Sequence, residues 1–209
     1  SGSHYLHHDW VLEGGSIETD GEGTILTTSP CLLNSNRNGE ISTEQAEAVM
    51  KEHLGAKRIL WLDHGHLEGD DTDSHIDTLA RFCNLNTICY VSCSDLNDPH
   101  YWSLKKMEQQ LQSFRTINGE PYRLAPLPMV SPQYDSDGRR LPATYANFLI
   151  INQAILMPVY QAPEDKIAVQ VLQALLPDRE IVAIDCTSLI KQNGSLHCIT
   201  MQIPKGFLS

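Results

Sequence analysis

Hydrophobic and polar positions along the chain repeat with a period of about 50 to 70 residues, and each copy reads strand, strand, helix, strand. In the first copy a helix is predicted over 43–54, because Ser42 and Gln45 have capping-box spacing and Gly55 can end it. Alternating or apolar runs predict the strands of this copy at 10–17, 24–33 and 58–62. The pattern therefore predicts an α/β fold built from similar units.

Two further copies keep the same order of elements. The second has predicted strands at 75–82, 87–93 and 122–127 and a helix at 100–114. The third has predicted strands at 145–151, 154–160 and 180–186 and a helix at 164–176. The polar, proline-containing stretch 131–142 lies between these copies, and we expect it to cover or border a pocket.

Beyond the third copy, residues 196–203 resemble the first strand of a fourth unit that does not continue. A lone strand needs partners, so we expect it either to pair with an early strand or to belong to a ring of which part is missing. We predict one domain over 1–209, with units at about 10–65, 75–130 and 144–187 and a closing strand at 196–204.

Charge and composition narrow the possible functions. The net charge of −11 has the wrong sign for neutralising phosphates, which argues against nucleic acid, whereas a negative field mildly favours a small cationic partner. No stretch is long and apolar enough for a membrane span, and the six cysteines include no CxxC pair. We therefore expect a cytoplasmic protein with reduced thiols.

Four polar side chains come at or near the start of a unit's first strand: Glu13, then His75 and Asp77, and finally Cys198. If the units surround an axis, these positions converge on it. A thiol attacks as thiolate and needs positive or donor groups nearby, which His75 could supply. If His75 and Asp77 lie in a strand, two residues apart, they point to the same face. The set suits nucleophilic catalysis at an electron-poor carbon.

Other interpretations of the same residues stay open at this point. His197-Cys198 is more often packing than catalysis, and the acidic run 70–73 could be a solvated loop or a helix cap. Metal binding is the main rival chemistry, through histidines and nearby aspartates; the histidines are His4, His7, His8, His64 and His66. His64-Gly65-His66 lacks a third ligand at a recognisable spacing, and for His4 to His8 we expect a frayed terminus. The register of an EF-hand is absent, and so is a serine nucleophile elbow. We expect no metal and no organic cofactor.

Several segments that appear in order carry a family resemblance. They are Glu13-Gly14-Gly15-Ser16-Ile17, Gly21-Glu22-Gly23-Thr24, Cys31-Leu32-Leu33-Asn34, Asn36-Arg37-Asn38, Gly69-Asp70-Asp71-Thr72-Asp73-Ser74-His75-Ile76-Asp77, Tyr145-Ala146-Asn147-Phe148 and Gly194-Ser195-Leu196-His197-Cys198-Ile199-Thr200. Together they resemble the agmatine deiminase and bacterial-type peptidylarginine deiminase family over nearly the whole chain. The resemblance implies the pentein fold, a five-bladed α/β propeller of ββαβ units, of which this chain would hold about three blades plus a final strand.

The resemblance also implies roles for the candidate residues. Cys198 would be the nucleophile, His75 the general acid and base, and Glu13 a carboxylate that supports His75 or the substrate. Asp77 would bind the guanidinium nitrogens, and we expect Asp71 and Asp73 in the same acidic segment to help bind the substrate. The expected reaction converts agmatine to N-carbamoylputrescine and ammonia through a covalent thiouronium on Cys198.

Two features separate this chain from the family pattern. Relatives carry an Arg-Asp-x-Gly-Pro segment ahead of Glu-Gly-Gly, whose aspartate grips the guanidinium, and nothing before Trp10 supplies it. Residues 192–195 stand where relatives usually have a glycine run ending in asparagine. We therefore expect an N-terminally incomplete propeller that is inactive alone and that self-associates or needs a partner. Peptidylarginine or arginine deimination and a non-catalytic binding module remain alternatives.

Overall fold

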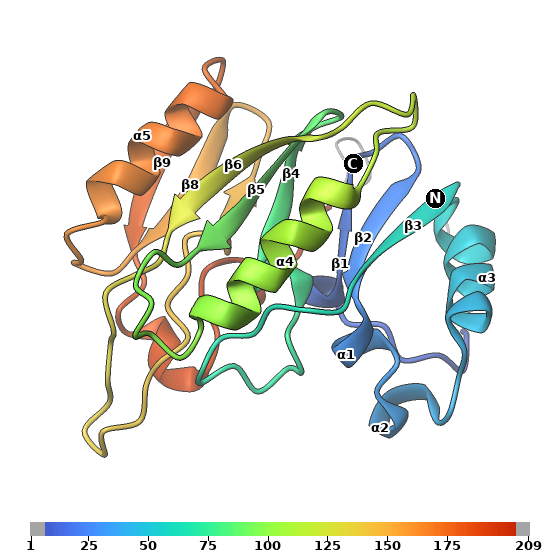
Figure 1. Cartoon of the computed structure of the whole chain (residues 1–209), viewed down its shortest axis with the longest axis horizontal. Coiled ribbons are helices and arrows are strands. Elements are labelled where there is room, and N and C mark those ends of the chain that lie inside the picture. Colours follow the sequence, from blue (N-terminus) through green and yellow to red (C-terminus); the bar gives the residue numbers. More distant parts are fainter. Residues whose placement is uncertain (1–6, 204–209) are drawn as a thin grey trace, which may run out of the picture.

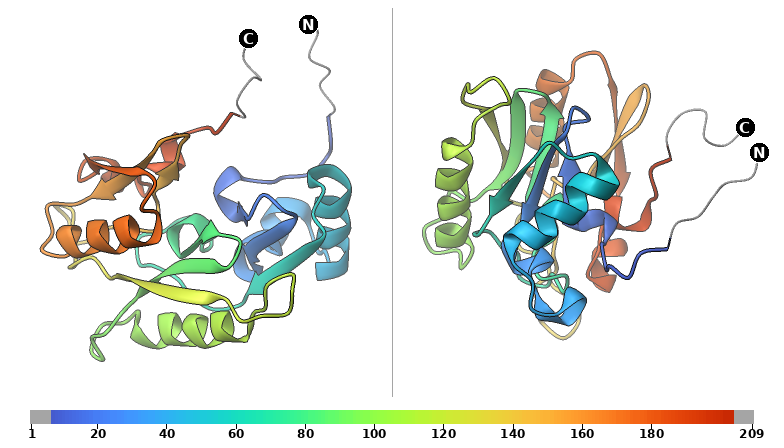
Figure 2. Two further views of the ribbon diagram at one scale, coloured as in Figure 1. Left: turned by 90° about the horizontal axis from the view of Figure 1, so that it is seen from above. Right: turned by 90° about the vertical axis from the view of Figure 1, so that its right-hand side faces the viewer.

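A computed structural model describes residues 7–203 of the chain. The strands form three small sheets of three strands each, and the sheets follow one another across the molecule in chain order (Figure 1). In every sheet the middle strand pairs antiparallel with the strand before it and parallel with the strand after it. Seen from above, the three units follow an arc (Figure 2). The predicted α/β repeat is confirmed.

The first unit shows how closely local sequence signals fix an element. Its members are η1 (Gly14–Ser16), β1 (Ile17–Thr19), β2 (Thr24–Thr28), α1 (Ser29–Leu32), α2 (Ser35–Asn38), α3 (Thr43–Leu54) and β3 (Arg58–Leu62). The predicted helix is confirmed: Ser42 Oγ accepts a hydrogen bond from the Gln45 N–H at 3.3 Å, and Gln45 Oε1 accepts one from the Ser42 N–H at 2.8 Å. Gly55 ends it at φ 69°, a left-handed conformation that glycine adopts without strain.

The other units repeat this arrangement with their own helices. The second contains η2 (Ile76–Thr78), β4 (Ala80–Asn84), β5 (Thr87–Ser92), α4 (Tyr101–Ser113) and β6 (Arg123–Pro128). The third contains β7 (Leu149–Ile150), β8 (Ala154–Val159), α5 (Asp165–Leu175) and β9 (Glu180–Asp185), followed by η3 (Leu189–Gln192) and η4 (His197–Ile199). Each long helix buries one apolar face against its neighbours, for example Leu104, Met107 and Leu111 of α4. Fully burying each such side chain contributes about 1.5–3 kcal/mol.

The first strand of each unit is shorter than predicted, and the predicted strand at 196–204 is wrong over its described part. The chain there makes a 3-10 turn instead, as it does at the start of the first two units. In each turn a hydroxyl donates to the carbonyl oxygen three residues earlier. The pairs are Ser16 with Glu13 at 2.6 Å, Thr78 with His75 at 2.8 Å and Thr200 with His197 at 2.8 Å. Such local hydrogen bonds compete with strand pairing.

A buried arginine joins the three units near their common centre. Arg81 of β4 donates through Nε to Glu18 Oε2 of the first unit at 2.8 Å. Its Nη1 donates to the carbonyl oxygens of Ala146 and Phe148, which lead into the third unit, at 3.1 and 2.5 Å. Burial disfavours the charged form, but Glu18 outweighs it, so the pKa of Arg81 is raised and the side chain stays a cation.

Candidate active site

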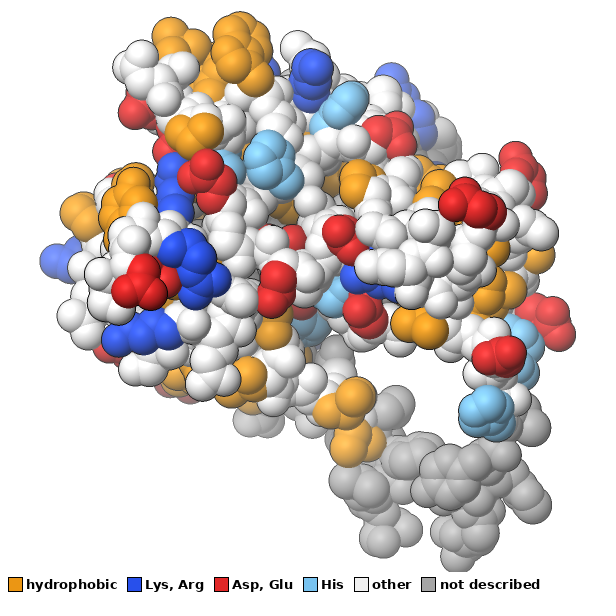
Figure 3. Space-filling view, turned by 90° about the horizontal axis from the view of Figure 1, so that it is seen from below, with side chains coloured by type: hydrophobic (Ala, Val, Ile, Leu, Met, Phe, Trp, Pro, Cys, Tyr) orange, Lys and Arg blue, Asp and Glu red, His pale blue; other side chains and the backbone are white. Residues whose placement is uncertain are grey.

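The turns that precede the first strands bring the predicted residues to one cavity. Its volume is about 640 Å³, and its lining includes Glu13, His75, Asp77 and Cys198, which come from three separate parts of the chain. Acidic and histidine side chains gather in the middle of the face drawn in Figure 3. The expected convergence of a carboxylate, an imidazole, a second carboxylate and a thiol is therefore what the structure contains.

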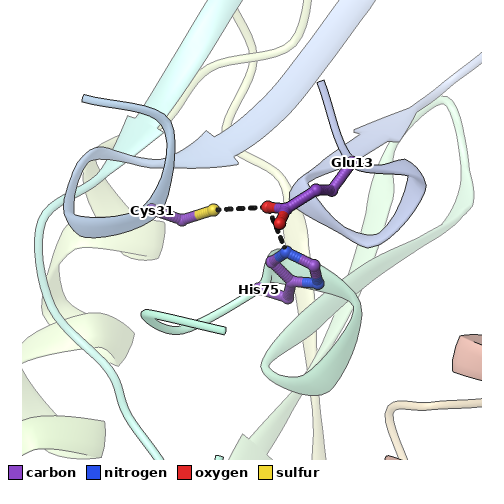
Figure 4. A group of neighbouring side chains, drawn as sticks. All are labelled: Glu13, Cys31 and His75. Atoms are coloured by element: carbon purple, nitrogen blue, oxygen red, sulfur yellow. Dashed lines mark hydrogen bonds and ion pairs between the residues drawn. The ribbon is translucent and has the colours of Figure 1, made fainter. Parts of the chain in front are cut away.

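Glu13 and His75 form a hydrogen-bonded pair in this cavity. His75 Nε2 lies 2.8 Å from Glu13 Oε2, and the same oxygen lies 3.8 Å from the sulfur of Cys31 (Figure 4). Burial raises the pKa of Glu13, but hydrogen bonds from Arg37 and His75 outweigh it and leave that pKa below its ordinary value. Glu13 is therefore a carboxylate at neutral pH and can hold one nitrogen of the imidazole.

Arg37 supplies the second partner of Glu13 and also changes the interpretation of Asp73. Its Nε donates to Glu13 Oε2 at 2.7 Å, and its Nη1 donates to Asp73 Oδ2 at 2.8 Å. Asp73 is not among the residues that line the cavity. Its carboxylate belongs to an ion pair behind the site, which does not support the expected role of Asp73 in substrate binding.

Asp77 is fully buried and only half satisfied. Its Oδ2 lies 2.7 Å from Nδ1 of His197, whereas its Oδ1 is buried without a hydrogen-bond partner among the described residues. A buried carboxylate oxygen without a donor is costly unless a ligand supplies one. As expected, His75 and Asp77 face one side of the cavity. The 3-10 turn η2 places them there, and not the strand alternation that we expected.

Gly15 explains why that side of the cavity is so close to the backbone. A Cβ at Gly15 would lie 2.6 Å from Nδ1 of His75 and 2.9 Å from Oδ2 of Asp77. Nothing lies within 4 Å of a Cβ built at the preceding Gly14. The second glycine of the pair therefore makes room for the imidazole and the carboxylate.

Cys198 is the one exposed cysteine of the six, and Asn147 holds its turn. Asn147 Oδ1 accepts from the N–H groups of His197 and Cys198 at 2.9 and 3.4 Å, and the Cys198 sulfur lies 3.5 Å from it. Burial of the sulfur and the negative charge of Asp77 raise the pKa of the Cys198 thiol. A nearby cation would be needed to favour the thiolate.

Asp71 lies at the cavity wall, where the loop 131–142 reaches it indirectly. Asn193 Nδ2 donates to Asp71 Oδ2 at 3.0 Å, and Arg139 of the loop donates to Asn193 Oδ1. The loop therefore borders the turn next to Cys198 and does not itself line the cavity.

The metal alternative concerns different residues from those expected. Between residues 7 and 203, the group of potential metal ligands that comes close together is Glu13, Cys31 and His75, with ligand atoms within 4.8 Å of one another. Arg37 already donates a hydrogen bond to Glu13, and burial raises the pKa of Cys31 to about 12, which keeps the thiol protonated. These three side chains are therefore better suited to hydrogen bonding than to holding a metal ion. His66 bonds Ser103, His8 stacks on His53, and His4 lies outside the described residues.

Sequence reasoning gave no role to three side chains that the structure places at the site. Asn147 and Arg37 stand in segments that carry the family resemblance, and that was the available signal. Packing was left open as an alternative for the His197-Cys198 dipeptide, and in the structure His197 contacts Asp77. No local pattern shows that these residues meet Cys198, Glu13 and Asp77, because each pair is far apart in the sequence.

Comparison with known proteins assigns the chain to a family. Residues 1–204 match the sequence model of the Porphyromonas-type peptidyl-arginine deiminases. The chain belongs to that family. Curated relatives of this family member include agmatine deiminases from Stutzerimonas stutzeri and Pseudomonas fluorescens, each 36% identical over 98% and 96% of the chain. The chain spans 60% and 59% of their lengths.

Solved structures of family relatives agree with the fold. A Porphyromonas gingivalis protein assigned provisionally as an arginine deiminase is 56% identical, with a TM-score of 0.92 over 94% of this chain and 58% of its own. A C. jejuni agmatine deiminase, solved as a cysteine-to-serine variant with substrate bound, is 46% identical, with a TM-score of 0.86 over 91% of this chain and 55% of its own. The pentein-type α/β fold is confirmed, and the number of blades in the whole propeller stays a prediction.

Two further expectations can be compared with the described residues. Over residues 7–203 no helix is both long enough and apolar enough to cross a membrane. All six cysteines are free, with Cys31, Cys83, Cys89 and Cys186 buried. Cys93 is partly exposed, and the expectation that the thiols are reduced stays a prediction.

Proposed function

We propose that the whole protein of which this chain forms a part hydrolyses a guanidine group, with agmatine as substrate and Cys198 as nucleophile. The observation that carries the proposal is the meeting of Cys198, His75, Asp77 and Glu13 at one cavity. Each residue then has the role that the family resemblance implies.

The unpartnered oxygen of Asp77 is the natural acceptor for the substrate. A guanidinium is planar and cationic, and it donates to carboxylates through parallel N–H groups. Asp77 Oδ1 is buried and lacks a donor, so a guanidinium N–H would satisfy it and the charge of the cation would offset the carboxylate. The same cation would lower the raised pKa of the Cys198 thiol, so that substrate binding itself generates the nucleophile.

The first half of the reaction forms a bond between sulfur and carbon. The thiol proton passes to His75, and the thiolate attacks the guanidinium carbon to give a tetrahedral adduct. His75 returns the proton to an amino nitrogen, the C–N bond breaks and ammonia leaves. A thiouronium cation remains on Cys198. Glu13 binds the Nε2 N–H of His75, so Nδ1 is the ring nitrogen that accepts and returns the transferred proton.

The second half releases the product by hydrolysis. Water attacks the thiouronium carbon while His75 takes its proton. The C–S bond then breaks, and the oxygen that came from water becomes the carbonyl oxygen of a ureido product. The remaining proton on that oxygen passes to the released ammonia. The thiolate recovers a proton from His75, which restores the starting state. Guanidinium and water have become a urea and ammonium, with Asp71 at the cavity wall as a further acidic contact for the substrate.

The choice of agmatine over arginine rests on charge. Four carboxylates line the cavity, namely Glu13, Glu18, Asp71 and Asp77, against the single guanidinium of Arg81, which Glu18 already pairs. This balance favours a substrate whose tail is an ammonium over one with a carboxylate. Peptidylarginine is the second candidate, because the matching family carries that name and a peptide link removes the carboxylate charge.

Product analysis tests the proposal and separates the candidates. The whole protein is incubated with agmatine, arginine and an arginine peptide, and the ureido products are measured by mass spectrometry. Agmatine turnover with kcat/KM at least about 10-fold above the others is expected, a difference of about 1.4 kcal/mol. Absence of turnover with all three in a folded protein would reject the enzyme in favour of a binding module on the same scaffold.

The finer assignments follow from this substrate. Deimination of agmatine to N-carbamoylputrescine would place the protein in putrescine and polyamine synthesis, and we propose a cytoplasmic enzyme without a resident metal or organic cofactor. We further propose a single catalytic domain and self-association. Sedimentation of the whole protein as a monodisperse monomer would reject the last point.

A further inference from the structure

Arg37 is a largely buried side chain, and all three of its guanidinium nitrogens donate hydrogen bonds around the Glu13–His75 pair. Nε donates to Glu13 Oε2 at 2.7 Å, and Nη1 donates to Asp73 Oδ2 at 2.8 Å and to the Cys31 carbonyl oxygen at 3.2 Å. Nη2 donates to the Thr72 carbonyl oxygen at 3.0 Å. The side chain is only 9% exposed. One guanidinium therefore connects the carboxylate that holds His75 to the loop that leads into His75.

That loop has an unusual backbone. Asp73 and Ser74 have φ values of 60° and 71°, in the left-handed region that residues with side chains rarely adopt, and they directly precede His75. Several bonds hold this conformation: Asp70 accepts from the Ser74 N–H at 2.8 Å, and Thr28 Oγ1 donates to the Ser74 carbonyl oxygen at 2.7 Å. A strained segment persists only where its surroundings fix it, and such segments gather at functional sites.

We propose that Arg37 is a positioning residue that sets the imidazole of His75 by holding Glu13 and the loop 72–74 in one fixed arrangement. The kinetic part of this proposal rests on the proposed function, whereas the structural part does not. Arg37 does not line the cavity, so it acts through Glu13 and the loop and has no contact with substrate.

The charges around Glu13 support this role. Arg37 of α2, His75 from the turn before η2 and Cys31 of α1 face its Oε2, and Asp73 lies on the far side of the guanidinium. Without the guanidinium, two carboxylates would lie close together with no cation between them. A lysine keeps the charge but has no planar fork, so it cannot bind two carboxylates and two carbonyl oxygens in this geometry.

Hydrogen exchange on the chain itself tests the structural part without any turnover. Arg37→Gln and Arg37→Lys are compared with Arg115→Gln, in which the lost guanidinium binds only carbonyl oxygens at the end of α4. Amides of 72–75 should exchange at least about 10-fold faster in Arg37→Gln, with Arg37→Lys between it and the wild type and Arg115→Gln unchanged. Unchanged exchange in a folded Arg37→Gln protein would overturn the proposal.

Steady-state kinetics of the whole protein test the catalytic part. In Arg37→Gln, kcat should fall about 10- to 100-fold with KM changed less than about threefold, since substrate contacts are intact. The Glu13 pKa should rise without its cationic partner, so the acid limb of the kcat profile should move to higher pH. A fall in kcat without that movement would overturn the role. If the wild type turns over no guanidine, the proposed function fails and the exchange result still decides whether Arg37 fixes the loop.

Discussion

The two halves of the cavity are built differently. On one side, Glu13 and His75 are fixed by Arg37, by the strained loop 72–74 and by buried hydroxyl contacts. On the other side, Cys198 is exposed in the middle of η4, a turn that Asn147 holds through one amide oxygen, and its thiol has a raised pKa. Under the proposed function, the half with His75 would be in place before substrate arrives, whereas Cys198 would need the cation of the substrate to ionise.

The largest effect should come from removing the nucleophile. Cys198→Ser in the whole protein should lower turnover of agmatine by at least about 10³-fold, because Cys198 is the only thiol among the described residues that line the cavity. Cys93→Ser, at the other cysteine that is not buried, is the matched control and should keep its activity. Ureido product is measured for both, and activity retained in Cys198→Ser would place the chemistry elsewhere.

Adding a methyl group next to His75 and Asp77 should lower turnover nearly as much. Gly15→Ala places a Cβ 2.6 Å from His75 and 2.9 Å from Asp77, so one or both must move. A displacement of about 1 Å at reacting groups lowers kcat about 100-fold. Gly14→Ala, which meets nothing within 4 Å, is the control and should behave as the wild type. Equal kcat values for the two variants would show that the position of this pair is not limiting.

Loosening the nucleophile turn should have a moderate effect. Asn147→Ala removes the acceptor for the N–H groups of His197 and Cys198, so the turn should lose its order. We expect kcat to fall about 10-fold or more, and iodoacetamide labelling of Cys198 to show a broader range of rates. Asn152→Ala, in the exposed turn between β7 and β8, serves as the control. Wild-type kcat in Asn147→Ala would mean that the turn orders itself.

The smallest expected effect is on the rate at which Cys198 is alkylated in the absence of substrate. Asp77 raises the Cys198 pKa, so Asp77→Asn should lower that pKa and speed alkylation of Cys198 about 3- to 10-fold at pH 8. In the wild type, alkylation should rise steeply with pH, because the thiol ionises only above its ordinary range. Slower alkylation in Asp77→Asn would show that His197, released from its partner, has a larger influence than the lost charge.

The sequence predicted the repeating units well because their helices have local end signals. Ser42, Gln45 and Gly55 define α3 without help from the rest of the chain. The first strands were predicted too long, since polar and apolar residues alternate in the turns before them. Spacing of a hydroxyl three residues after Glu13, His75 and His197 marks these turns in retrospect.

The sequence predicted only those site residues that occupy equivalent positions in the repeated units. Equivalent positions in the units gave Glu13, His75, Asp77 and Cys198, and all four line the cavity. The ion pair of Asp73 was missed because nothing in a run of acids shows which one pairs with an arginine 36 residues away. Contacts of this kind depend on the path of the loops between units, which local patterns do not encode.

Arg81 couples the unfolding of the three sheets. Its guanidinium belongs to the second unit, its carboxylate partner Glu18 to the first, and its carbonyl partners precede and begin the third. Pulling any one unit away would leave a desolvated cation without its full set of acceptors, which is costly inside a protein. Denaturation should therefore proceed as one cooperative transition across all three sheets, unlike a linear array of repeats whose members melt individually.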